Sequence, residues 1–472
     1  MSGRKFLPRA WLLAALCVTP MANAEPVESW VVAALSSNLS LQAESTSVES
    51  ALRAIDLARS ALRPNVELQA RYTRTEGGRV IELPLGDLVN PAYQTLNELT
   101  AASGNPTAFP TIENERFMLQ REREQDTRLS MSLPLWAPGL RANVRASEAN
   151  ALAAHSRREA LARTLVRDTR QACYSVLQAQ ADLDNLIAAE ASLAENLRAT
   201  RVLFDAGRST REPVLRAQAE QLDAAQRVIE ARNTLKQSQR YLNFLVNRGI
   251  ESPVQVEVAE SDRLLAFGAA ESFDHDEPAQ RAELRQAQQS IVAADAQLDS
   301  ARSENWPTLS LGASYGVQGT DYNVGADDDM GSVSLNLSWT LFDGGARKAR
   351  QAQAELSGQQ LRQQREQLRQ QIELEQQRAT DDARTQAQAL LSAEARSEAA
   401  DEALRIAGKR REAGSLTQLE FFDARRALTD AQTAETLARY RHLASLAELE
   451  YATTAYALPS NLLADAAGRV LP

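Results

Sequence analysis

The sequence has few of the residues that fill an ordinary globular core or build a catalytic site. Phe, Trp and Tyr together make up only 5% of its 472 residues, although aromatic side chains supply much of the buried area in compact domains. It has three histidines, far apart and without neighbours at metal-ligand spacing. We find no glycine-rich phosphate loop and no nucleophile motif. We therefore expect a thin helical protein that is not an enzyme and that holds no cofactor or metal.

Positive charge comes almost entirely from arginine. Only four of the 52 basic residues are lysines, namely Lys5, Lys236, Lys348 and Lys409. The formal net charge is −10, and the arginines are interspersed with acidic residues. Because nucleic-acid binding needs a clustered basic face, we expect no nucleic-acid partner.

The first 24 residues have the pattern of a secretory signal peptide, although a buried N-terminal helix is the alternative. Basic residues precede the apolar stretch Ala10 to Val18, and the segment ends in Ala22-Asn23-Ala24. This small-residue ending predicts cleavage after Ala24. No run of 18 or more apolar residues follows, so we expect no membrane-spanning helix. Any crossing of lipid by this chain has to use a closed β-barrel.

Long stretches almost free of glycine and proline dominate the rest of the chain. Leu140 to Ala206 contains neither residue, and Ala346 to Ala413 contains only two glycines. At about 1.5 Å per residue, a helix over the first stretch is on the order of 100 Å long. Second helical stretches follow from Val214 to Arg248 and from Ser415 to Leu458. The sequence therefore predicts two long helical hairpins.

Heptad spacing supports coiled-coil packing of these helices. Apolar residues recur every seven positions in several places, among them Leu215, Leu222 and Ile229. Such a seam is typical of helices that pack along their length. One thin hairpin cannot bury its own apolar face, so other helices have to cover it.

The two hairpins are copies of each other. MSLPLWAPGLR at 131–141 aligns with LSWTLFDGGAR at 337–347, and FDAGRST at 204–210 aligns with REAGSLT at 411–417. Period-two alternation, which predicts β-strands, appears just outside each hairpin. It covers Val66 to Tyr72, Leu129 to Leu135, Leu309 to Val317 and Val333 to Leu341.

These strands fit either a soluble antiparallel sheet with one wet face or strands that cross lipid. The long hairpins, the signal peptide and a polar, glycine- and proline-containing segment at 74–126 favour the second interpretation. We expect that segment to be a long external loop. Four strands are too few to close a membrane barrel, since the smallest bacterial examples have eight. Two, three or four copies of the chain are compatible with closure.

The duplicated order of motifs resembles the TolC family of outer-membrane channel-tunnels over essentially the whole mature chain. The resemblance rests on SALRPNVELQARYT and SARSENWPTLSLGASY, on FDGGAR, and on the AG-x-x-T motif at both hairpin ends. It implies a fold that is mainly α with a β-barrel portion. Each chain would contribute four transmembrane β-strands and two long coiled-coil helical hairpins, and three chains would close the channel-tunnel as a homotrimer.

The resemblance also implies a division of the chain. After the signal peptide at 1–24, a first strand and hairpin repeat covers 25–248. An equatorial linker at 249–278 joins it to a second repeat at 279–458, and a tail covers 459–472.

The candidate site lies at the hairpin ends. By resemblance, Glu420 and Asp423 are the acidic residues of the periplasmic constriction, where three copies should raise some carboxyl pKa values. Three residues apart, they share one helical face; an ordinary solvated face is the alternative. Gly207 and Thr210, with Gly414 and Thr417, mark the tips that contact an adaptor. Arg411 and Leu416 stand where the family has a gate Tyr and Arg, and Glu212 adjoins Pro213, which stands where an acidic residue is expected. Arg411 and Glu212 of a neighbouring helix are therefore candidate gate contacts.

The function implied by the resemblance is the exit duct of a multicomponent export system, serving either drug efflux or type I protein secretion. Such a duct is passive. It opens when a periplasmic adaptor and an inner-membrane RND or ABC transporter dock at its periplasmic tip, while outer-membrane lipid surrounds the barrel. The alternative is a structural periplasmic coiled-coil scaffold without transport activity.

Overall fold

The computed structural model describes residues 25–104, 108–119, 121–257, 281–320, 328–413 and 415–463. The predicted signal peptide, most of the linker and most of the tail lie outside these residues. The chain forms two compact units. The strand unit comprises Arg53–Glu148 and Val292–Gly358, and the helical unit comprises the remaining segments.

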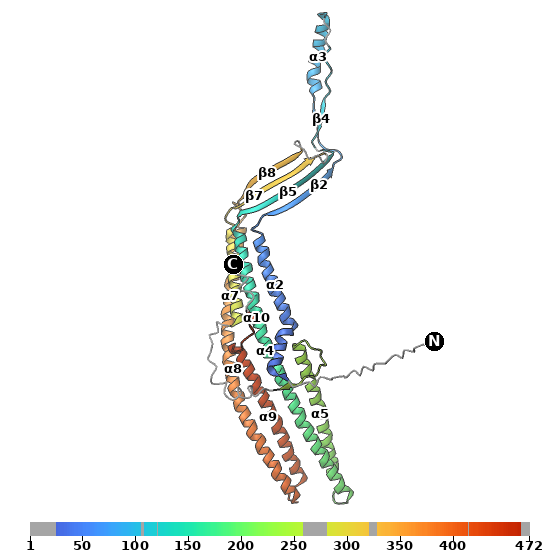
Figure 1. Ribbon diagram of the computed structural model, residues 1–472, viewed down its shortest axis with the longest axis vertical. Helices are drawn as coiled ribbons and strands as arrows, with labels where there is room; N and C mark the ends of the chain where they lie inside the picture. The colour runs from blue at the N-terminus through green and yellow to red at the C-terminus, as the bar shows by residue number, and fades with distance from the viewer. Residues whose placement is uncertain are drawn as a thin grey trace, which may run out of the picture. The chain divides into compact units, whose positions relative to one another are not determined.

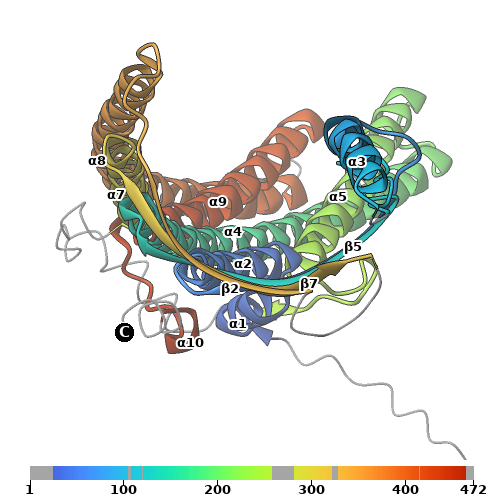
Figure 2. The ribbon, with the colours of Figure 1, turned by 90° about the horizontal axis from the view of Figure 1, so that it is seen from above.

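The strand unit contains a four-stranded antiparallel sheet (Figure 1). Its strands are β2 (Asn65–Arg74), β5 (Arg123–Trp136), β7 (Thr308–Gly319) and β8 (Asp329–Ser338), in the order β2-β5-β7-β8. All four alternating segments of the sequence are therefore strands. Figure 2 shows the sheet as a curved band. Within the described chain, β2 and β8 are edge strands that each pair on one side only.

The register sorts apolar and polar side chains onto opposite faces of the sheet. One apolar row across the four strands consists of Val66, Met131, Ala313 and Val333. The next row, on the other face, consists of Glu67, Ser130, Ser314 and Ser332. The apolar face is open, since Val333 is 77% exposed and Leu335 is 63% exposed. Nothing in the described chain covers this face.

The segment expected to be a long external loop is an ordered arm. β3 (Val80–Leu83) pairs with β4 (Glu115–Met118), and α3 (Leu85–Ala102) lies between them. The segment thus contains two short strands and a helix, and its position outside the barrel stays a prediction. Glycine, proline and polar residues suggested a loop, whereas contacts between α3 and the returning chain, described below, hold it in place.

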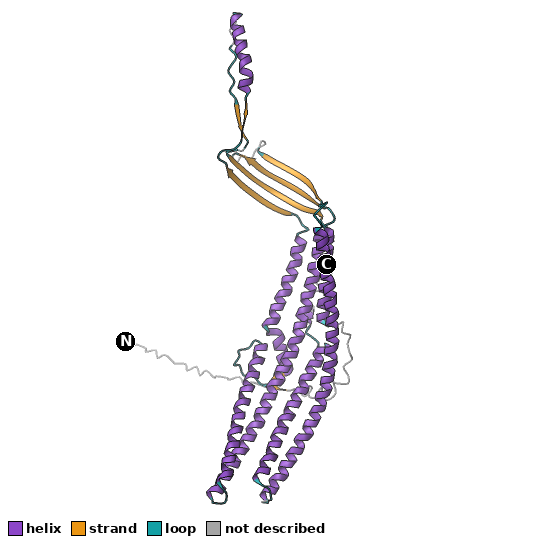
Figure 3. Cartoon of the chain, turned by 180° about the vertical axis from the view of Figure 1, so that it is seen from behind, coloured by secondary structure: helices purple, strands orange, loops and turns teal. Residues whose placement is uncertain are grey.

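Four long helices form the two predicted hairpins (Figure 3). α4 (Pro138–Asp205) is followed by α5 (Arg211–Leu245), and α8 (Ala346–Glu412) is followed by α9 (Gln418–Thr453). Their boundaries match the predicted stretches to within a few residues. The shorter helices are α1 (Val27–Ser37), α2 (Leu39–Ser60), α7 (Ala282–Ser303) and α10 (Ser460–Leu463).

The FDGGAR motif has a local physical role at the start of α8. Gly344 and Gly345 have φ values of 65° and 92°, a backbone region that favours glycine. The Asp343 carboxylate accepts hydrogen bonds from the backbone N–H groups of Gly345 (3.2 Å) and Arg347 (2.9 Å). These bonds, that from Arg347 foremost, lower the pKa of Asp343. The motif therefore turns the chain and caps the helix that follows.

The core of the helical unit gathers around α1 and the middle of α4. Trp30 and Val31 are buried with Cys173, Leu242 and neighbouring aliphatic residues. Burial raises the pKa of the Cys173 thiol to about 12, as expected for a thiol in an apolar core. A short parallel pair of β1 (Glu25–Pro26) and β6 (Val256–Glu257) lies beside this core. Leucine and valine dominate this core, and alanine is frequent among the other buried residues of the described chain, consistent with the low aromatic content.

No helix within the described ranges combines the length and the apolar character that a membrane crossing requires.

Candidate functional site

The hairpin ends are short turns with a threonine at the start of the second helix. In the first hairpin, Gly207 has φ +70° and Thr210 is the N-cap of α5, without a side-chain capping bond. In the second hairpin, Gly414 lies outside the described residues, and Thr417 is the N-cap of α9. Thr210 and Thr417 therefore each stand at the start of the second helix of a hairpin.

Thr417 and Glu420 form a capping box. The Glu420 carboxylate accepts hydrogen bonds from the Thr417 backbone N–H (2.9 Å) and hydroxyl (2.7 Å), while the Glu420 N–H donates to Thr417 Oγ1 (3.3 Å). The bonds from Thr417 lower the pKa of Glu420. This direction is opposite to the rise expected from a ring of like charges. In a single chain, therefore, Glu420 serves the start of its own helix.

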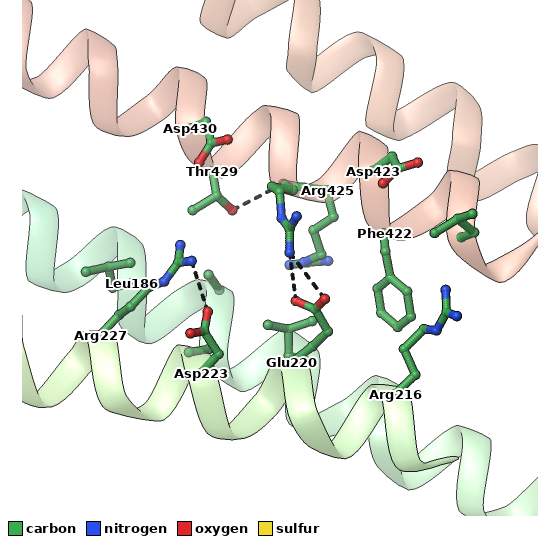
Figure 4. A pocket seen from close by; sticks show the side chains of 15 residues that line it. Leu186, Arg216, Glu220, Asp223, Arg227, Phe422, Asp423, Arg425, Thr429 and Asp430 are labelled. Atoms are coloured by element: carbon green, nitrogen blue, oxygen red, sulfur yellow. Dashed lines mark hydrogen bonds and ion pairs between the residues drawn. The ribbon is translucent and has the colours of Figure 1, made fainter. Parts of the chain in front are cut away.

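Asp423 lies one turn further along α9 and borders a cavity of about 140 Å³ between α4, α5 and α9. Figure 4 shows Phe422 pointing from α9 toward α5, with Glu220 and Asp223 on the facing helix. Leu186 on α4 contributes to the apolar part of the lining. The cavity therefore lies between the first hairpin, which contributes α4 and α5, and the second, which contributes α9.

Ion pairs flank this cavity. Arg426 on α9 contacts both carboxylate oxygens of Glu220 on α5 at 3.2 Å, and Arg227 pairs with Asp223 at 2.9 Å within α5. Arg425 is half-buried in the cavity wall, and burial lowers the pKa of its guanidinium. The Arg426–Glu220 pair joins one hairpin to the other. Sequence reasoning missed it, because no local pattern shows which residues of separate helices face each other.

The structure gives Arg411 and Glu212 separate partners. The Arg411 guanidinium donates to Asn196 Oδ1 on α4 (3.2 Å) and lies 4.4 Å from the ring centre of Phe421. Glu212 pairs with Arg216, one turn further along α5, at 3.2 Å. An Arg411–Glu212 pair is therefore not formed within the described chain. Arg411 nevertheless connects the two hairpins through Asn196.

These contacts between the two hairpins are individually weak. The Arg426–Glu220 pair and the Arg411–Asn196 hydrogen bond are partly exposed, and exposed pairs contribute only about 0–1 kcal/mol each. Among the described residues, no group of three or more His, Cys, Asp or Glu side chains is placed to hold a metal ion.

Family comparison identifies the chain. The profile of the outer membrane efflux protein family matches residues 115–248 and 275–454, one segment for each half of the duplication. The chain belongs to this family. It is therefore a member of a family of outer-membrane efflux channels, which are passive channels and not enzymes. A comparison with curated proteins finds no match.

Solved structures share the fold. The chain is similar to the CmeC outer membrane channel of Campylobacter jejuni, with a TM-score of 0.74 and 18% identity over 96% of this chain and 94% of that one. It is also similar to the open state of the MtrE outer membrane channel of Neisseria gonorrhoeae, with a TM-score of 0.70 and 19% identity over 90% and 88%. At these identities the likeness concerns the fold, which is the TolC-like channel-tunnel with an internal duplication.

Proposed function

We propose that this outer-membrane efflux protein is the exit duct of a multicomponent export system, for drug efflux or type I protein secretion, and that three copies form one duct through the outer membrane and periplasm. The supporting observation is the incomplete sheet of the strand unit. Its apolar face is open, and both of its edge strands lack a second partner within the described chain. Unpaired strand edges tend to pair with other chains, and exposed leucine side chains are unfavourable in water. Each copy therefore needs neighbouring copies at its strand edges and lipid at its apolar face.

Three copies place twelve strands in one closed sheet, within the range of bacterial outer-membrane barrels. The helices also expose an apolar surface that a neighbouring copy can cover. Leu215, Leu222 and Ile229 are spaced by seven along α5 and are 53%, 58% and 58% exposed. A helix of another copy can cover this seam by coiled-coil packing. A solitary periplasmic scaffold would leave both the seam and the apolar sheet face in water.

The duct is closed at its periplasmic tip, in this proposal, by the ends of the hairpins. Asp423 from three copies narrows the pore and favours cations, and Glu420 adds charge while capping its own helix. The Arg426–Glu220 pair and the Arg411–Asn196 bond hold the hairpins together. An adaptor and an inner-membrane RND or ABC transporter, docking at the tips around Thr210 and Thr417, separate them. The energy comes from the transporter.

Charge-neutral variants test the gate without disturbing the helix start. We expect Glu420→Gln/Asp423→Asn to lower the cation preference of single channels in planar bilayers, because the variant removes the ring charges. Gln at the third helical position preserves a capping box, so the fold of the tip is retained. Arg53→Gln/Asp56→Asn, a neutralised exposed pair on α2 outside both hairpins, is the control. Unchanged ion selectivity in the gate variant contradicts the assignment of Glu420 and Asp423.

A further inference from the structure

The arm between β2 and β5 presents a stripe of leucines that the chain leaves uncovered. On α3, Leu88 is 74% exposed and Leu99 is 61% exposed, and Leu85 and Leu96 are each more than 40% exposed. Leu85, Ala92 and Leu99 are spaced by seven, with Leu88 and Leu96 between them. This is the spacing of a coiled-coil seam, which fits another helix better than a flat surface.

The opposite face of α3 is already occupied by the chain's own returning segment. Asn90 exchanges two hydrogen bonds with the backbone of Ile112, both at 2.8 Å. Asn97 does the same with Phe109, at 3.1 and 2.7 Å. These two asparagines are also seven residues apart, so each clamps the return segment at the same angular position on the helix. The clamps fix which face of α3 is presented outward.

The backbones of α3 and the returning segment also come into close contact on the clamped face. A Cβ at Gly86 would lie 2.4 Å from the carbonyl oxygen of Ile112, so only glycine permits the approach. Tyr93 packs against Phe109 with ring centres 5.3 Å apart, and Asn114 donates to the Asp87 carboxylate at 3.0 Å. The arm is thus a built element whose leucine stripe cannot turn inward.

The composition of the arm argues for a helix of another copy as the occupant of the stripe. Residues 85–104 contain no lysine or arginine, whereas helices that lie on anionic lipid surfaces have basic polar faces. α3 has a proline within it, Pro91, and helices in proteins gain most of their stability from packing of an apolar face. An isolated two-stranded ribbon such as β3 and β4 is marginally stable in water. Both gain stability if identical arms pack together.

We propose that the α3 helices of the three copies pack against one another through Leu85, Leu88, Leu96 and Leu99, and form a helical bundle beyond the ends of β2 and β5. This inference rests on the proposed trimer. The arm is connected to those strands at Arg74 and Arg123, opposite the strand ends that lead to α2 and α4. Closure of the sheet by three copies therefore holds the three arms near one another. The resulting high effective concentration allows α3 helices to associate even if their intrinsic affinity is low.

Disulfide trapping in the full-length chain tests the bundle. Leu99→Cys places a thiol on the stripe, and Gln94→Cys places one on an exposed position about 140° around the same helix. The native Cys173 is buried, so it contributes little background. In detergent-solubilised protein under mild oxidation, we expect about tenfold more covalent dimer from Leu99→Cys than from Gln94→Cys, because tethered thiols meet at high effective concentration. Adding Leu88→Ser to Leu99→Cys should reduce that yield.

Light scattering on the same samples separates the two proposals. A trimer in which both cysteine variants cross-link equally, or not at all, overturns the bundle and leaves the duct intact. A monomer overturns both. A bimane probe on Leu99→Cys that is quenched by brominated lipids in vesicles shows that lipid occupies the stripe, and this too contradicts the bundle.

Discussion

At the scale of single residues, buried charge in the helical unit stands out. Glu159 on α4 is 1% exposed and bridges Arg163 (3.1 Å) and Arg285 (2.6 Å), the second of which belongs to α7. A buried carboxylate is tolerated only when it is paired and hydrogen-bonded. The rotation of α4 that buries Glu159 depends on α7, which is distant in sequence.

Removal of this carboxylate should destabilise the helical unit. We expect Glu159→Ala to lower stability by about 3 kcal/mol, since it leaves two arginines without their buried partner. Glu195→Ala is the matched control on the same helix, because the Glu195–Arg198 pair is mostly exposed and is worth at most about 1 kcal/mol. Chemical denaturation followed by circular dichroism measures both. Equal midpoints for the two variants contradict a structural role for the buried pair.

At the scale of elements, the duplication supplies an internal comparison of helix starts. Thr417-x-x-Glu420 is a capping-box motif visible in the sequence, yet the resemblance drew attention to these residues as tip and gate positions. The first repeat has Pro213 where the second has Glu420, so Thr210 has no such partner and makes no side-chain cap. The two tips therefore differ in how firmly their second helix begins.

Alanine at the two threonines should have unequal effects. We expect Thr417→Ala to speed amide hydrogen exchange in the first turn of α9, because it removes the acceptor for the Glu420 N–H. Thr210→Ala should leave the first turn of α5 nearly unchanged. The half of the capping box that the Glu420 carboxylate supplies also depends on pH. Because hydrogen bonds from Thr417 lower the pKa of Glu420 in the folded chain, the stabilisation from this carboxylate is complete above the ordinary glutamate value of about 4.3 and is lost as the pH falls through the lowered pKa. Equal exchange rates at the helix starts of the Thr417→Ala and Thr210→Ala variants contradict the proposed difference between the two caps.

At the scale of the whole molecule, the main feature is the exposed apolar face of the sheet, which is more stable against lipid than in water. Leu335 and Ser334 are neighbours on β8 that point to opposite faces, and their register partners are Leu311 and Gly312. In the proposed duct, Leu335 faces lipid and Ser334 faces the interior.

Arginine substitutions at these neighbours test that arrangement. We expect Leu335→Arg to reduce the amount of trimer recovered from the outer membrane, since an arginine facing lipid costs about 2–4 kcal/mol at the bilayer midplane. Ser334→Arg should be tolerated and should instead alter ion selectivity. Outer-membrane fractionation followed by light scattering provides the measurement. Equal loss of trimer in both variants argues against a lipid-facing apolar side.

The amino-acid sequence predicted the four strands of the large sheet and the two hairpins, because their signals are local, but it missed β3, α3 and β4. Alternation of period two marked the four strands, and the scarcity of glycine and proline fixed the two hairpins to within a few residues. The tertiary structure decided what depends on contacts between distant segments. Hydrogen bonds from two asparagines hold α3 against the returning segment at 108–119, and helix packing pairs Arg426 with Glu220. The same packing places the Arg411 guanidinium beside Asn196 and not beside Glu212. Periodicity reports which face of an element is apolar, but only the packed chain determines which faces meet.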